Sequence, residues 1–184
     1  AKRPSAVENV CDLPGGLVLL ATVIQSARMD DLRDRLARVL PNRQTFDAIL
    51  ELIAKPVPVP SGPEHVTDED VAHAAAYAVG WWLGQGGRAG TGRDGRDNTP
   101  TMSVRFDAVG GSGPSRFAAF IDSLEALRDR LRSVAVFKGD AFLVLPQIPD
   151  RFTSAIYIDP PFIVQGKALY THAFDVTPRD EPGL

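Results

Sequence analysis

The sequence predicts an α/β fold, because short apolar strands alternate with segments of helical periodicity. Strands are expected at residues 6–11, 134–137 and 155–158, where apolar and β-branched residues form runs of strand length. Apolar residues at helical spacing fill much of the chain between the first two strands. With 184 residues, of which 44% are hydrophobic and 23% charged, the chain has the composition of one ordinary globular domain.

The first half of the chain is predicted to be mostly helical. After a Pro- and Gly-containing turn at residues 12–16, an apolar run continues at helical spacing to Leu40, where Pro41 stops it. Thr45 is expected to cap a further helix through Ile53. The proline-spaced residues 56–63 must be extended, and an Ala-rich, buried helix is expected from Thr67-Asp-Glu-Asp70 to Trp82.

The second half is predicted to return to the sheet after a long loop. Residues 84–113 hold many of the glycines together with several arginines, so no regular helix is expected there. Pro114 opens an amphipathic helix that runs to Leu131, and the strand at residues 134–137 follows.

Composition excludes several classes of protein. The single cysteine, Cys11, excludes an internal disulfide and a multi-cysteine zinc site, and the three scattered histidines do not suggest a metal site. No apolar run approaches the roughly 20 residues that a membrane span requires, and the N-terminus does not resemble a signal peptide. We therefore expect a cytoplasmic protein with no membrane partner. The net charge of −3 argues against a uniformly basic surface. The arginines are unevenly distributed, however, so a local nucleic-acid-binding surface is compatible with the sequence.

The motif that suggests chemistry is Asp159-Pro160-Pro161-Phe162, directly after the last predicted strand. The amine of a nucleobase is a poor nucleophile because its lone pair is delocalised into the ring, so it needs acceptors for its hydrogens. The Asp159 carboxylate and the Pro160 carbonyl supply two acceptors, and the Phe162 ring offers a face on which a flipped base can stack. Taken alone, Asp-Pro-Pro is equally well explained as a turn that ends a strand.

Acidic residues end all three predicted strands, at Asp12, Asp140 and Asp159. Open α/β sheets bind ligands at the carboxyl ends of their strands, so this placement favours a ligand site. Asp12 is suited to accept hydrogen bonds from ribose hydroxyls, and Asp140, with Ala141, from the amine of an adenine. Each of these two residues is also explained as a helix or loop cap.

Several segments together resemble the Dam-like, alpha-group adenine-specific DNA methyltransferases. They are Glu8-Asn-Val-Cys-Asp-Leu13, the apolar run 17–24, Gly139-Asp140, Asp159-Pro-Pro-Phe162 and Leu169-Tyr170. The resemblance implies S-adenosyl-L-methionine as cofactor and double-stranded DNA as partner. It also implies a partial Rossmann-like methyltransferase sheet, built from residues 1–25 and 114–184, with residues 26–113 as a helical target-recognition insert.

The same resemblance suggests where DNA binds. Residues 77–92 look like the glycine-rich segment of the family, which implies a position near DNA. The arginines of this loop are expected to neutralise phosphates or reach base edges, or else simply to solvate the loop. Tyr170 is expected to shape the adenine pocket, or to pack in the core. Trp81 and Trp82 could stack on bases, but they are expected to pack in the core or against helices and are left out of the site. The arginines concerned are Arg88, Arg93, Arg96 and Arg105.

The chain departs from the family pattern at both ends. The Phe-x-Gly-x-Gly loop of the family would lie shortly before Ser5, and the family continues beyond Phe174 with further elements. The resemblance therefore implies an enzyme truncated at both ends, whose missing first strand would lie between the strands ending at Asp12 and Asp159. Residues 13–16 follow the ribose acid and do not replace the missing loop.

Three other functions remain open. A ribosomal-RNA guanine amino-methyltransferase also carries Asp-Pro-Pro-Phe, but such enzymes lack so long an insert before the Gly-Asp segment. A truncated, non-catalytic relative would still bind DNA through its insert. In a plain α/β domain, the prolines and acids would only terminate strands.

Overall fold

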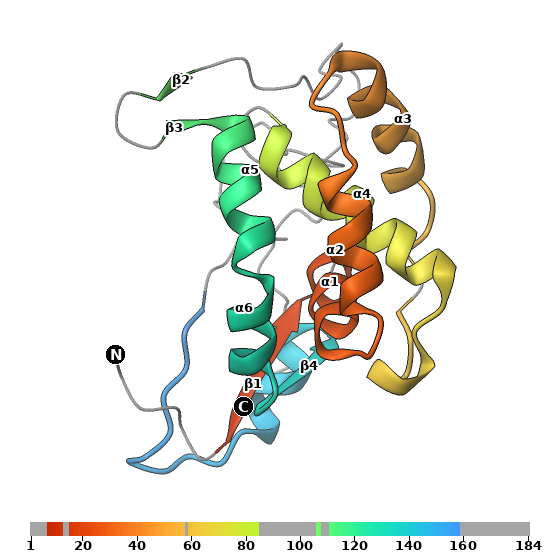
Figure 1. The fold of residues 1–184 in the computed structure, drawn as a ribbon. Helices are drawn as coiled ribbons and strands as arrows, with labels where there is room; N and C mark the ends of the chain where they lie inside the picture. Colours follow the sequence, from red (N-terminus) through yellow and green to blue (C-terminus); the bar gives the residue numbers. More distant parts are fainter. Residues whose placement is uncertain (1–6, 13–14, 58, 85–105, 108–110, 159–184) are drawn as a thin grey trace, which may run out of the picture.

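The computed structural model describes a mixed α/β chain (Figure 1). Its described residues are 7–12, 15–57, 59–84, 106–107 and 111–158. They contain seven α-helices and a two-stranded parallel sheet, formed by β1 (Glu8–Asp12) and β4 (Val134–Lys138). A second, antiparallel pair joins β2 (Phe106–Asp107) to β3 (Gly111–Ser112). The sheet lies at one end of the molecule beneath a layer of helices (Figure 1). No described helix is both long and apolar enough to cross a membrane.

The parallel pairing of β1 with β4 joins segments that are far apart in the sequence. Glu8 lies opposite Val134 and Asp12 lies opposite Lys138, and the amide of Gly139 extends the ladder by donating to the Asp12 carbonyl at 3.2 Å. The strands predicted at residues 6–11 and 134–137 are therefore confirmed. Because the strands are parallel, their carboxyl ends lie at the same edge of the sheet.

The apolar run that follows β1 forms two helices instead of one continuous periodic segment. They are α1 (Gly16–Gln25) and α2 (Met29–Ala37), separated at Ser26. The Ser26 hydroxyl donates to the Val23 carbonyl at 2.7 Å and accepts from the Arg28 amide at 3.0 Å. This local bonding competes with the helical pattern, so the chain turns although its apolar spacing continues.

The next helix, α3 (Arg43–Ile53), begins three residues earlier than a helix capped by Thr45 would. Asn42 caps it by accepting a hydrogen bond from the Thr45 amide at 2.9 Å, so the prediction of Thr45 as cap was wrong. Asn42 has the extended backbone that a cap requires, whereas Thr45 already lies within the first turn. The following proline-spaced stretch is irregular where it is described and ends in a short 3₁₀ helix, η1 (Pro63–His65).

The central helix is α4 (Asp68–Leu83), as predicted. A capping box starts it: the Thr67 hydroxyl accepts from the Asp70 amide, and the Asp70 carboxylate accepts from the Thr67 amide. The alanines of α4 let neighbouring helices approach closely, and it packs against α1, α2, α3 and α5. One hydrophobic core thus contains residues from both sides of the domain boundaries predicted after residues 25 and 113.

The helix predicted from Pro114 to Leu131 is also divided in two. It forms α5 (Gly113–Asp122) and α6 (Leu124–Leu131), and the Ser123 hydroxyl donates to the Phe120 carbonyl at the break. After β4 come the short helix α7 (Ala141–Val144) and the 3₁₀ helix η3 (Leu145–Gln147).

The strand predicted at residues 155–158 is not formed. These residues have no regular structure, and the side chains of Ile156, Tyr157 and Ile158 are 52%, 90% and 56% exposed. A strand exists only through its ladder with a neighbour, and among the described residues β1 pairs on one edge only, with β4. The apolar composition predicted a strand here, but no neighbouring strand forms hydrogen bonds with these residues within the described part of the chain.

We expect Thr67→Ala to lower the free energy of unfolding by about 1 kcal/mol, because it removes the side-chain cap of the central helix. Chemical denaturation of the purified chain measures the change. Thr45→Ala is the matched control, because that hydroxyl caps no helix start, and its effect should stay within about 0.5 kcal/mol. Equal losses in the two variants would contradict the assigned caps.

Candidate functional site

The carboxyl ends of β1 and β4 bring two of the predicted acids together. Asp12 is the last residue of β1, and Asp140 follows β4 after Gly139. Both carboxylates act on the thiol of Cys11, whose pKa is raised by burial first, then by Asp12 and by Asp140. The thiol itself lies across the strand pair and donates to the Gly139 carbonyl at 3.2 Å. Asp12, Asp140 and Cys11 therefore form one cluster at this edge.

Asp140 has a structural role in this cluster as well. It is the N-cap of α7, and its Oδ1 accepts a hydrogen bond from the Phe142 amide at 2.9 Å. The interpretation of Asp140 as a capping residue is thus confirmed. A carboxylate offers about four acceptor positions, so this bond leaves capacity for a ligand amine beside Ala141, the first residue of α7.

The turn between β1 and α1 has glycines where the chain is crowded. Gly15 has a left-handed backbone, with φ of 82°, and lies against the aliphatic stem of Lys138. Gly16 lies under the ring of Tyr77: a Cβ atom at this position would be 2.4 Å from the ring. The described part of this turn therefore has no room for side chains at Gly15 and Gly16, and Lys138 and Tyr77 pack directly against its backbone.

Tyr77 is a residue of this edge that the sequence did not reveal. It projects from α4, and its pKa is raised to about 12, first by burial and then by the charge of Asp12. A polar aromatic residue within an otherwise Ala-rich buried helix was the available signal, because a buried tyrosine hydroxyl usually has a polar partner. Through Tyr77, α4 reaches the carboxyl end of β1.

The two tryptophans of α4 are more exposed than a core position allows. Trp81 is 48% and Trp82 is 39% exposed. Trp82 stacks on Phe120 with 5.2 Å between ring centroids, so its predicted packing against a helix is confirmed. Trp81 meets Tyr77 edge to face at 6.0 Å. The small residues of α4 occupy the core, and the indoles lie at its rim.

The remaining predicted site residues lie outside the described part of the chain. They are Asp159, Pro160, Pro161, Phe162, Tyr170, Arg88, Arg93, Arg96 and Arg105.

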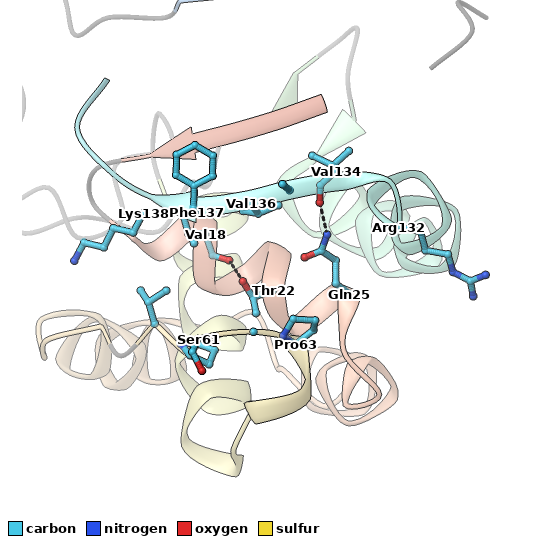
Figure 2. Close-up of a pocket in the computed structure, with 14 residues that line it drawn as sticks. Val18, Thr22, Gln25, Ser61, Pro63, Arg132, Val134, Val136, Phe137 and Lys138 are labelled. Atoms are coloured by element: carbon cyan, nitrogen blue, oxygen red, sulfur yellow. Dashed lines mark hydrogen bonds between the residues drawn. The ribbon is translucent and has the colours of Figure 1, made fainter. Parts of the chain in front are cut away.

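A separate cavity of about 600 Å³ borders β4 on the side away from β1 (Figure 2). It lies between β4, α1 and residues 59–63, and among the described residues its charged lining consists of Arg132 and Lys138. Gln25 closes one end by donating from Nε2 to the carbonyls of Leu131 and Val134, each at 2.8 Å. Neither Asp12 nor Asp140 lines this cavity, so it is distinct from the acidic edge.

Comparison with known proteins identified no relative: no family model, curated protein or solved structure matches the chain. Within the described ranges, no group of three or more His, Cys, Asp or Glu side chains is arranged to hold a metal ion. The candidate site is therefore defined by its own geometry, as two carboxylates near Gly15, Gly16 and the partly buried Tyr77.

The raised pKa of Cys11 provides a test of this cluster. Alkylation by iodoacetamide requires the thiolate, so its rate should rise with pH around a midpoint above the ordinary pKa of 9.0. Between these two pKa values the unfolded chain loses the proton first, so the free energy of unfolding should fall as pH rises.

We expect Asp12→Asn and Asp140→Asn each to lower that midpoint and to speed alkylation at pH 8. The exposed Asp150 does not act on Cys11, so Asp150→Asn serves as the control. If neither substitution moved the midpoint, the two carboxylates would not share one edge with the thiol.

Proposed function

We propose that this chain is an S-adenosylmethionine-dependent DNA adenine methyltransferase, with a Rossmann-like sheet and a helical target-recognition insert. The observation that carries the proposal is the adjacency of Asp12 and Asp140 at the carboxyl edge of a parallel strand pair. These are the positions at which the resemblance to Dam-like enzymes implies the ribose and adenine contacts. The helices between β1 and β4 favour a DNA enzyme over a ribosomal-RNA enzyme, which lacks a long insert at this point.

The residues at this edge fit the adenosyl part of the cofactor. Asp12 offers acceptors to the ribose hydroxyls, and Asp140 offers them to the adenine amine. Gly15 and Gly16 let Lys138 and Tyr77 pack closely against the start of α1, on the chain segment that follows Asp12. When bound, the cofactor supplies an electrophilic methyl group on a sulfonium sulfur.

The catalytic groups of the proposal come from the sequence motif Asp159-Pro-Pro-Phe162. The Asp159 carboxylate and the Pro160 carbonyl accept the hydrogens of the target amine, which makes its lone pair available. Phe162 stacks on the everted adenine, and Pro161 restricts the backbone between them. The bound cofactor would supply the methyl group to this lone pair and leave as a thioether, and Asp159 or solvent would take the proton that the methylated amine loses.

Two substitutions separate cofactor binding from chemistry. We expect Asp12→Ala to weaken S-adenosylmethionine binding by about 10- to 100-fold, the effect of losing a hydrogen bond to a charged group. We expect Asp159→Ala to leave that binding nearly unchanged but to lower methyl transfer to DNA by about 10²- to 10⁴-fold. Calorimetry measures the binding, and transfer of a radiolabelled methyl group to DNA measures the activity.

Asp122→Ala is the control, because Asp122 is an exposed acid on α5. Methyl transfer that survives Asp159→Ala would contradict the proposed chemistry. Binding of DNA without any binding of S-adenosylmethionine would instead identify a non-catalytic relative.

A further inference from the structure

Trp81 combines exposure with fixed orientation. Its exposed fraction is 48%, although most residues of α4 are buried. The indole meets the ring of Tyr77 edge to face, with 6.0 Å between the ring centroids. Trp82, by comparison, covers part of its ring by stacking on Phe120. An indole that is oriented by a neighbour and still exposed is suited to stack on a ligand.

Tyr77 connects this indole to the acidic edge of the sheet. Tyr77 lies against Gly16, at the start of α1. It is also close enough to Asp12 for the charge of that carboxylate to raise the tyrosine pKa. Trp81 is the next aromatic residue along the same side of α4, one helical turn further on. Ribose hydroxyls bound at Asp12 would therefore lie near Tyr77, whose ring contacts the indole of Trp81.

We propose that Trp81 is a further cofactor-binding residue, whose indole packs on the adenosyl group held at Asp12, and that Tyr77 positions the indole. The inference rests on the proposed function, since it concerns the same cofactor edge. Stacking suits this role because a purine presents a π-face to an aromatic side chain, while Asp12 and Asp140 engage the polar edges. It also gives the predicted recognition insert, to which α4 belongs, a direct contact with the cofactor.

The chain offers a spectroscopic test, because its two tryptophans are both on α4. In Trp82→Phe, Trp81 is the only remaining tryptophan, and in Trp81→Phe only Trp82 remains. Titration with S-adenosylhomocysteine, which carries the same adenosyl group, should change the tryptophan emission of Trp82→Phe in a saturable way. The emission of Trp81→Phe should change far less.

Affinities measured by calorimetry complete the test. We expect Trp81→Ala to weaken S-adenosylhomocysteine binding about tenfold or more, and Trp81→Phe to retain most of the affinity because it keeps a stacking ring. Tyr77→Phe keeps the ring that contacts both Gly16 and Trp81, so it should also retain most of the affinity. Circular dichroism verifies that each variant is folded.

The outcomes separate this inference from the proposed function. If Asp12→Ala loses binding while Trp81→Ala binds like the unaltered chain, the role of Trp81 is refuted and the function stands. An emission change confined to Trp82 would equally refute it. If the unaltered chain does not bind S-adenosylhomocysteine, both the inference and the proposed cofactor site fail.

Discussion

The parallel pairing of β1 with β4 is the constraint on which the rest of the structure depends. It joins the beginning of the chain to a strand more than a hundred residues later, so the intervening helices must cross back over the sheet. Gln25 secures this crossing, because its amide bonds both the end of α6 and the start of β4. The pairing also determines that Asp12 and Asp140 share one edge.

The helix α4 links this edge to the rest of the molecule. Its alanines pack among α1, α2, α3 and α5, and Tyr77 on the same helix lies against the first residue of α1. The helices that the sequence assigns to recognition and the strands that it assigns to the cofactor therefore share one core. In the proposed enzyme, displacement of α4 on binding DNA would act directly on the surroundings of Asp12.

Local signals in the sequence were sufficient for several elements. Thr67 and Asp70 predicted the start of α4, and two apolar runs predicted β1 and β4. These predictions succeeded because helix capping and hydrophobic periodicity depend on residues that are close together in the sequence. The breaks at Ser26 and Ser123 were missed, since a serine hydroxyl that bonds a preceding carbonyl leaves the apolar pattern intact. The prediction of a strand at residues 155–158 was wrong for a different reason. An apolar run can indicate a strand, but it does not show which neighbouring strand would form hydrogen bonds with it.

The candidate site was predictable to a similar extent. Asp12 and Asp140 followed from their positions at strand ends, and the structure brings them together around Cys11. Tyr77 was not predicted to belong to this edge, because its neighbour Gly16 is distant in the chain and the contact depends on how α4 crosses α1. The Asp159-Pro-Pro-Phe162 motif stays a prediction of the sequence.

The most direct test is a titration of the isotopically labelled chain with S-adenosylhomocysteine, followed through its backbone amide resonances. The account predicts saturable shifts concentrated at Asp12, Gly139 and Asp140. Shifts concentrated instead at Ser61 and Val136, which line the cavity on the far side of β4, would contradict it, as would a spectrum that does not change.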